Sequence, residues 1–273
     1  PVLVGQRIRD AATADHIVKS GKADLVGMAR ALLADPELPN KSAEGRLGEV
    51  RGCLGINQDC RAFDPHLHCA VNAEIGRGRL PGVGVRADTI KDVYVIGGGP
   101  AGLEAARVAA GRGHRVTVFE AAAELGGAVR VAARSPHRAT IIDVIDYLSG
   151  EMRRLGVDVN LGAEIGRDDL AELVDAADHV VVATGSRPDP VRGSGRGPAV
   201  VTVDDVLTGR VPDAPGRAVV YDESDGFWPA YSAAEALVAR GWDTRVVTPL
   251  TALASRVPAE SVGPLLGRLG SAG

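Results

Sequence analysis

The chain has 273 residues, 45% of them hydrophobic, and is long enough to form one large globular domain or two small ones. Its net charge of −4 comes from interspersed acidic and basic residues, and aromatic residues make up 3%, which argues against a nucleic-acid-binding protein. Its apolar runs are shorter than the roughly 18 residues of a membrane span, and residues 1–6 lack a signal-peptide pattern, so we expect a cytoplasmic protein without a membrane partner.

The first 48 residues predict a strand, a helix, a second strand and then helical or irregular chain. Their expected bounds are 1–5, 11–20, 23–26 and 27–48, with a break at Asp35-Pro36-Glu37. Asp10 is a typical N-cap for the helix, and Gly21 suits the left-handed position just past its end. Because the chain starts with Pro1 and enters the strand directly, we interpret it as a fragment of a longer protein.

Residues 49–91 contain all three cysteines, followed by a connector rich in Gly, Arg and Pro. Cys53, Cys60 and Cys69 are close together in the sequence, and their odd number does not suit a disulfide framework in a reducing compartment. Their clustering therefore favours a metal site. We expect a linker over residues 76–91.

From residue 92 onward the chain alternates predicted strands and helices. Strands are expected at 93–96, 116–120, 157–161 and 179–183, and helices at 101–110 and 139–155. A strand, a helix and a strand are expected again at 218–221, 231–240 and 244–247. This order predicts an α/β fold with a Rossmann-like nucleotide-binding domain over 92–198 and a partial second domain of that kind over 199–273.

A glycine-rich turn follows the first of these strands, in the sequence Val-Ile-Gly-Gly-Gly-Pro-Ala-Gly-Leu-Glu at 95–104. Gly97 permits a tight turn, and Gly99 lets a pyrophosphate approach the backbone closely. Gly102 lets the following helix pack near the strand. The spacing is that of a dinucleotide-binding turn.

The residues around the turn support the same interpretation. Pro100 and Ala101 open the helix, whose N-terminus favours negative charge. Glu120 ends the next predicted strand, where its carboxylate would accept hydrogen bonds from ribose hydroxyls and repel a 2′-phosphate. The turn therefore predicts a site for the ADP half of an FAD-like cofactor.

Two further motifs, Glu124-Leu125-Gly126-Gly127 and Val182-Ala183-Thr184-Gly185, follow in order. With the glycine-rich turn they resemble the FAD/ADP domain of flavin reductases that have two dinucleotide-binding domains. The resemblance implies that Gly126 and Gly127 pass close to the cofactor. It also implies that Ala183, Thr184 and Gly185 mark the crossing to the second nucleotide domain.

The segment before the turn carries a second, more specific resemblance. Gly-Gln-Arg-Ile-Arg-Asp at 5–10, with the stretch from Ala23 to Lys41, resembles the last two βα units of the Old Yellow Enzyme type of barrel. Phosphate sites in such barrels lie on the loops after the last strands. The resemblance implies that Gly5 and Gly27 bind an FMN phosphate through backbone N–H groups and that Arg30 is its charged partner.

The whole order of segments resembles the Old Yellow Enzyme-like multi-cofactor flavin oxidoreductases, of the 2,4-dienoyl-CoA reductase and trimethylamine dehydrogenase type. The resemblance implies the end of a (β/α)8 barrel over 1–48, then the FAD/ADP domain and a partial NAD(P)-like domain. It also implies that most of the barrel, with the catalytic side chains, lies upstream, so no catalytic residue is assigned.

One departure from this family concerns the cysteines. Its members carry four thiolates for a [4Fe-4S] cluster, and Cys53 and Cys60 match the first and third positions. The second position is Ile56, which cannot coordinate iron, and the spacing to Cys69 is shorter than in the family. A four-iron cluster would need a substitute ligand: Asp59, His66 or His68. We favour a degenerate loop with free thiols over an intact cluster.

A second departure lies after Tyr221, where a pyridine-nucleotide site needs another glycine-rich turn. Asp222, Glu223 and Asp225 would repel a pyrophosphate there, and Trp228 would obstruct its approach. This turn favours the amine-dehydrogenase branch of the family, whose electrons leave to a separate electron-transfer flavoprotein.

The leading hypothesis is thus part of a flavin-dependent oxidoreductase in which electrons pass between a small-molecule substrate at FMN and an FAD- or ADP-containing domain. One alternative is an NAD(P)H-dependent enoate or 2,4-dienoyl-CoA reductase. Another is a nucleotide-binding module without turnover of its own.

Overall fold

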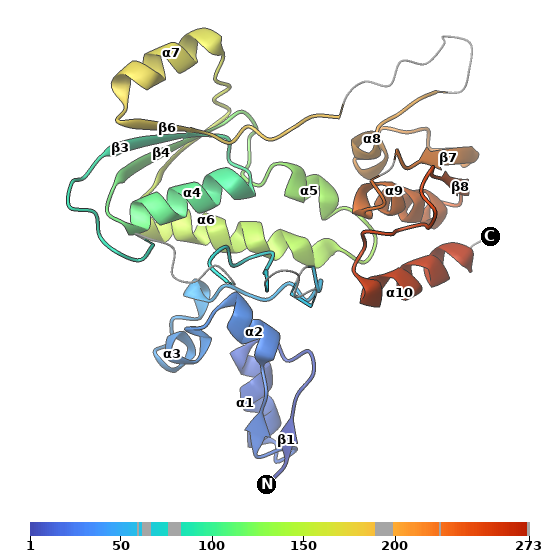
Figure 1. Ribbon diagram of the computed structural model, residues 1–273, viewed down its shortest axis with the longest axis horizontal. Helices are drawn as coiled ribbons and strands as arrows, with labels where there is room; N and C mark the ends of the chain where they lie inside the picture. The colour runs from blue at the N-terminus through green and yellow to red at the C-terminus, as the bar shows by residue number, and fades with distance from the viewer. Residues whose placement is uncertain (59, 62–66, 76–82, 189–198, 224, 272–273) are drawn as a thin grey trace. The chain divides into compact units, whose positions relative to one another are not determined.

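The computed structural model describes residues 1–58, 60–61, 67–75, 83–188, 199–223 and 225–271. They form two compact units, one made of residues 1–127 and 142–185, the other of 128–141 and 186–273 (Figure 1). The strand pairs of the described residues are all parallel, which confirms the α/β class predicted from the sequence. None of the described helices is long and apolar enough to span a membrane.

The first unit opens with a βαβ arrangement. β1 (Leu3–Val4) and β2 (Leu25–Val26) pair in parallel, and α1 (Ala11–Lys19) connects them. The predicted caps are confirmed, since the Asp10 carboxylate accepts a hydrogen bond from the Thr13 N–H at 2.8 Å and Gly21 has a φ of +70°. Three short helices follow: α2 (Ala29–Ala34), α3 (Leu38–Ala43) and the 3₁₀ helix η1 (Leu47–Glu49).

A four-stranded sheet in the order β5-β4-β3-β6 forms the centre of the first unit. Its strands are β3 (Asp92–Ile96), β4 (Arg115–Glu120), β5 (Asp158–Leu161) and β6 (His179–Val182). The helix α4 (Pro100–Gly111) packs on one face of the sheet, and α6 (Asp143–Leu155) lies alongside α4 (Figure 1). Val95, Val118, Leu103 and Ile145 are almost completely buried between these elements.

The structure differs from the sequence-based helix predictions at two places between β4 and β6. The helix predicted over 139–155 begins as the 3₁₀ helix η2 (Ala139–Ile142), and α6 starts only at Asp143. The helix α7 (Arg167–Ala176) was not predicted. Its signal is the Asp169 carboxylate, which accepts a hydrogen bond from the Gly166 N–H at 2.8 Å and so caps the helix start.

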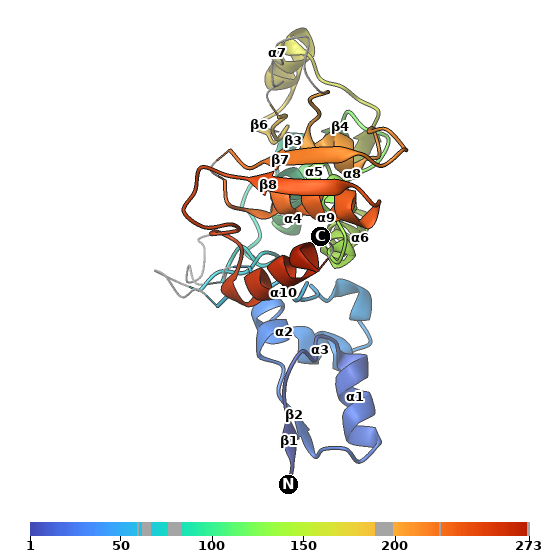
Figure 2. The same ribbon diagram turned by 90° about the vertical axis from the view of Figure 1, so that its right-hand side faces the viewer.

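The second unit has a two-stranded parallel sheet of β7 (Arg217–Tyr221) and β8 (Asp243–Val247), with α9 (Trp228–Ala239) against one face (Figure 2). These three elements lie close to their predicted positions. Tyr231 of α9 is fully buried in the core of the unit. Three further helices were not predicted: α5 (Ala128–Ala132), α8 (Val203–Leu207) and α10 (Ala259–Gly270). The sequence of α10 contains Pro264 and three glycines, which weaken a helical pattern.

Candidate cofactor-binding sites

The glycine-rich turn connects β3 to α4, and Gly99 is the N-cap of α4. Gly97 has a φ of +109°, and a Cβ there would overlap the carbonyl oxygen of Ala183. A Cβ at Gly102 would overlap the carbonyl oxygen of Gly97. The protein's own packing therefore requires the first and third glycines.

Gly99 has a different environment. A Cβ added at Gly99 would meet no non-neighbouring described atom within 4 Å. Pro100 and Ala101 form the first turn of α4, where backbone N–H groups have no acceptor within the helix and the helix dipole favours an anion. The turn thus offers open space beside a helix N-terminus.

The second glycine pair lies against this turn. The Gly126 N–H donates a hydrogen bond to the Gly98 carbonyl oxygen at 2.8 Å. A Cβ at Gly127, whose φ is +51°, would lie 3.4 Å from the Gly99 Cα. Two segments that are distant in the sequence are therefore in direct contact.

Glu120 is held at the same place. Its Oε2 accepts a hydrogen bond from the Gly98 N–H at 2.6 Å, and its Oε1 accepts one from the Ala122 N–H at 2.8 Å. A carboxylate has about four acceptor positions, so both oxygens can accept further hydrogen bonds. The protein's own backbone N–H groups therefore hold the carboxylate at the turn.

The third motif completes the edge of the sheet. The Ala183 N–H donates to the Ile96 carbonyl oxygen at 2.8 Å, which fixes the end of β6 beside the end of β3. Thr184 follows, and Gly185 has a φ of +73°. The structure thus brings all three predicted motifs to the carboxyl edge of the parallel sheet, where ligands of such folds bind.

The predicted FMN-phosphate residues line a second site in the same unit. Gly5, Gly27 and Arg30 border one cavity of about 350 Å³, formed by residues 5–9 and 27–30. The Gly27 N–H donates to the Val4 carbonyl oxygen at 2.8 Å, so the expectation that it binds the phosphate is wrong. Sequence reasoning missed two arginines that also line it, Arg7 and Arg9. Both stand in the quoted Gly-Gln-Arg-Ile-Arg-Asp motif, so their spacing after the strand was an available signal. Three guanidinium groups suit a dianionic phosphate.

The cysteine segment does not form a metal site in the part of the chain that the structure describes. There, no three His, Cys, Asp or Glu side chains are grouped as metal ligands would be. Burial raises the pKa of the Cys60 thiol, the Cys53 and Cys69 thiols add to this, and the Arg30 guanidinium opposes it. Two of the named substitute ligands, Asp59 and His66, lie outside the described residues. The metal site that the clustering of the cysteines favoured is therefore not formed among the described residues.

The acidic turn of the second unit is closed by one of its own carboxylates. Asp222 is 2% exposed and accepts hydrogen bonds from the backbone N–H of Asp225 at 3.1 Å and of Gly226 at 3.0 Å. The buried Tyr231 hydroxyl donates a third at 2.9 Å. Backbone N–H groups that a pyrophosphate could use are already bound to this carboxylate.

Trp228, the first residue of α9, is covered by Arg138. The Arg138 guanidinium carbon lies 3.9 Å from the centre of the Trp228 ring, a cation–π contact. Burial lowers the pKa of Arg138 to about 10, an effect that the negative charge of Glu235 opposes. Arg138 therefore remains charged at neutral pH and holds the indole in place beside the acidic turn.

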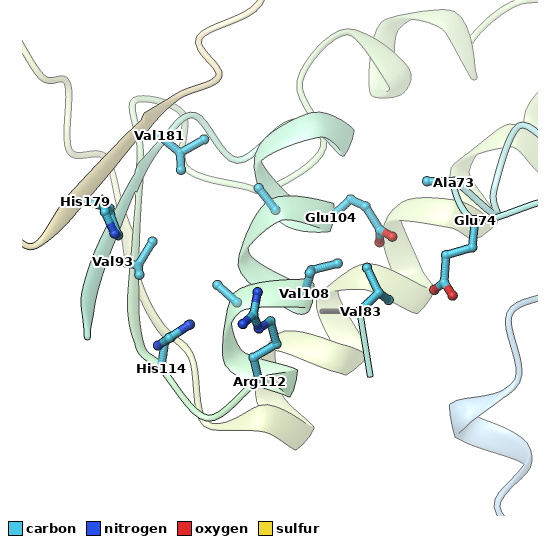
Figure 3. Close-up of a pocket in the computed structure, with 12 residues that line it drawn as sticks. Ala73, Glu74, Val83, Val93, Glu104, Val108, Arg112, His114, His179 and Val181 are labelled. Atoms are coloured by element: carbon cyan, nitrogen blue, oxygen red, sulfur yellow. The ribbon is translucent and has the colours of Figure 1, made fainter. Parts of the chain in front are cut away.

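A larger cavity, of about 480 Å³, lies beside α4 (Figure 3). Val93, Val108 and Val181 form part of its apolar wall, and His114 and His179 also line it. His114 and His179 mark the amino ends of β4 and β6, opposite the glycine-rich turn. The cavity therefore includes none of the predicted cofactor residues.

Comparisons with known proteins match both parts of the chain that carry these sites. Residues 91–221 match a family model described as pyridine nucleotide-disulphide oxidoreductase. Residues 1–49 match one described as the NADH:flavin oxidoreductase / NADH oxidase family. The chain is 39% identical to an NADH oxidase from Thermoanaerobacter brockii, over 77% of this chain and 33% of that protein. It is 38% identical to an N,N-dimethylglycine/sarcosine dehydrogenase from Chromohalobacter salexigens, over 91% of this chain and 37% of that protein.

A solved structure of an amine oxidase also matches the full length of this chain. The 6-hydroxypseudooxynicotine amine oxidase from Pseudomonas geniculata N1 matches 100% of this chain and 43% of its own, with 30% identity and a TM-score of 0.88. The chain belongs to the Old Yellow Enzyme-like family of multi-cofactor flavin oxidoreductases. The family resemblance found in the sequence is thereby confirmed. For an Old Yellow Enzyme-like chain, the model matched over 1–49 implies FMN and the model matched over 91–221 implies FAD. The chain spans well under half the length of these relatives.

Proposed function

We propose that this chain is the part of a flavin-dependent oxidoreductase that holds the FMN phosphate and the ADP half of FAD. In the longer protein, electrons pass between a small-molecule substrate at FMN and the second cofactor. The observation that carries the proposal is the meeting of Gly99, Gly127 and Glu120 at one turn with open space beside Gly99.

Each group of residues has a role in this proposal. The open backbone at Gly99, with Pro100 and Ala101 at the start of α4, receives the pyrophosphate. Glu120 accepts hydrogen bonds from the ribose hydroxyls. When bound, the flavins supply the redox chemistry, and the protein supplies binding and orientation.

The remaining predicted residues complete the two sites. Gly97 and Gly102 set the backbone path of the turn, and Gly126, Gly127 and the Ala183-Thr184-Gly185 segment border the FAD. Gly5 and Arg30 bind the FMN phosphate at the end of a partial barrel over residues 1–48, and Gly27 borders the same cavity. The cysteine segment over 49–91, the Rossmann-like domain over 92–198 and a partial NAD(P)-like domain over 199–273 complete the proposed plan.

The second unit favours an amine-dehydrogenase-like enzyme that passes its electrons to a separate electron-transfer flavoprotein. The Asp222 carboxylate fills the turn where an NAD(P)H pyrophosphate would bind. NADH or NADPH binding by the chain, detected by calorimetry, would favour the reductase alternative instead.

The Gly99→Ala variant tests the FAD site. Its unfolding free energy is expected to stay within about 1 kcal/mol of wild type, because the methyl group enters open space. Its affinity for ADP and FAD is expected to fall about tenfold or more, because the methyl group keeps the pyrophosphate from the backbone. Calorimetric titration measures the affinity of wild type and of Gly99→Ala for ADP and FAD. Gly111→Ala, at the far end of α4, is the matched control. Equal ADP affinity in all three proteins would refute the site.

A further inference from the structure

The cysteine segment contacts the arginines of the FMN-phosphate cavity without using its thiols. The Arg30 Nη1 donates a hydrogen bond to the side-chain Oδ1 of Asn57. The Arg9 Nη1 donates to the backbone carbonyl oxygens of Cys53 and Leu54, both at 3.2 Å. Two of the three arginines that line the cavity are therefore held from the side of residues 53–57.

The backbone of this segment is shaped for these contacts. Gly55 has a φ of +71°, and a Cβ there would lie 3.4 Å from the Arg9 Cδ and 4.0 Å from the Arg7 Nη2. Asn57 has a φ of +57°, a left-handed conformation that asparagine adopts more easily than most residues. The segment thus approaches all three arginines closely, and its two left-handed residues are of types that accept this conformation.

Contacts that hold the arginine side chains in place favour the binding of an anion in the cavity. Three guanidinium groups around one cavity repel one another, and each has a long side chain that loses conformational freedom when it binds an anion. An acceptor that holds a guanidinium before binding reduces this loss and directs the remaining N–H groups. Asn57 carries no charge, so it orients Arg30 without neutralising it.

We propose that Asn57 is a positioning residue for the phosphate site, and that residues 53–57 form a wall that orients Arg30 and Arg9. This role rests on the proposed function, in which the cavity binds the FMN phosphate. It requires an amide and two backbone carbonyls but no thiolate, so it does not depend on an iron-sulfur cluster.

The test uses the whole chain and inorganic phosphate as the probe. Nitrogen-15 NMR follows the backbone N–H signals of Gly5 and Gly27 during the titration, and the side-chain signals of Arg30 without phosphate. Asn57→Gly removes the amide and keeps a residue that tolerates a positive φ, so the loop is not strained. It is expected to weaken phosphate binding about tenfold. The hydrogen bond to Asn57 should slow rotation of the Arg30 guanidinium in wild type, and the variant is expected to show faster rotation. Asn40→Ala, at an exposed site on α3, is the control.

The outcomes separate the two proposals. No effect of phosphate on the wild-type signals would refute the phosphate site itself and the positioning role with it. Phosphate binding that is equal in wild type and Asn57→Gly would refute only the role of Asn57. A Cys60→Ser/Cys69→Ser variant is expected to bind phosphate within about twofold of wild type. A larger loss in a variant that remains folded would show that the segment acts through its thiols.

Discussion

Two glycines of α4 differ in how closely other atoms of the protein approach them. At Gly102 the chain approaches the carbonyl oxygen of Gly97 more closely than any Cβ could tolerate, whereas at Gly111, in the last turn of α4, an added Cβ would meet no non-neighbouring described atom within 4 Å. The same substitution should therefore have different effects on stability at the two positions.

We expect Gly102→Ala to lower the unfolding free energy by about 2 kcal/mol or more, because α4 must move away from β3. Gly111→Ala should be neutral or stabilise the chain by up to about 1 kcal/mol, because alanine restricts the unfolded chain. Urea denaturation followed by far-ultraviolet circular dichroism measures both variants. Equal stabilities would show that the close approach at Gly102 is relieved without cost.

At the scale of elements, one buried carboxylate connects the turn after β7 to α9. Asp222, at the end of β7, accepts hydrogen bonds from the turn and from the Tyr231 hydroxyl, and the Ala254 N–H donates to that hydroxyl at 2.6 Å. A strand end, a helix and a distant loop are thereby connected through two side chains.

Asp222→Ala should lower the stability of the second unit by about 2–4 kcal/mol, because it leaves buried donors without an acceptor. Glu223→Ala, at the neighbouring exposed carboxylate, should change it by less than about 0.5 kcal/mol. The fluorescence of Trp228 and Trp242 during urea unfolding reports on this unit. Similar losses in the two variants would contradict a structural role specific to Asp222.

The short helix α8 has a charge-dependent start. Thr202 and Asp205 form a reciprocal cap, and Arg210 contacts the same carboxylate at 2.8 Å. Hydrogen bonds from the Thr202 backbone and hydroxyl, together with Arg210, lower the pKa of Asp205 to about 2, below its ordinary 3.8. Folding therefore favours the carboxylate.

This cap should be fully effective above pH 4 and should be lost as the pH falls through about 2. NMR titration of the Asp205 carboxyl carbon is expected to show this low midpoint, and Arg210→Ala should raise it. An unchanged midpoint in the variant, or a wild-type midpoint near 3.8, would contradict the capping network.

At the scale of the whole molecule, the proposed FAD site lies entirely within one of the two units. The glycine-rich turn, Glu120, the Gly126-Gly127 pair and the Ala183–Gly185 segment all belong to the first unit. A ligand that binds there should stabilise the units unequally.

Addition of ADP at 100 times its Kd should stabilise the first unit by about 2.7 kcal/mol, because binding to the folded form alone shifts its unfolding equilibrium. Hydrogen exchange followed by mass spectrometry should show slower exchange in β3, α4 and β4 and unchanged exchange in β7 and α9. Uniform slowing across both units, or none in the first, would contradict this assignment.

The sequence was a good guide wherever a contact is local or repeats a known spacing. The caps of α1 and the turn at Gly97–Gly102 were predicted because a few neighbouring residues determine them. The parallel strands were predicted because strands and helices alternate along the chain. The inward position of Asp222 and the hydrogen bond of Asn57 were not predicted, because they depend on residues brought together by folding. The helices α5, α8 and α10 were missed because they are short or interrupted by glycine and proline.

The division of the chain into two units limits where the chain can be truncated to produce one unit alone. Residues 128–141 belong to the second unit although residues on both sides of them belong to the first. A product cut after Gly185 would therefore carry 14 residues separated from their packing partners. The complementary product from Ser186 onward would lack Arg138 and leave the Trp228 ring uncovered. A clean separation needs the 128–141 segment fused to the second piece and a short synthetic loop from Gly127 to Ile142.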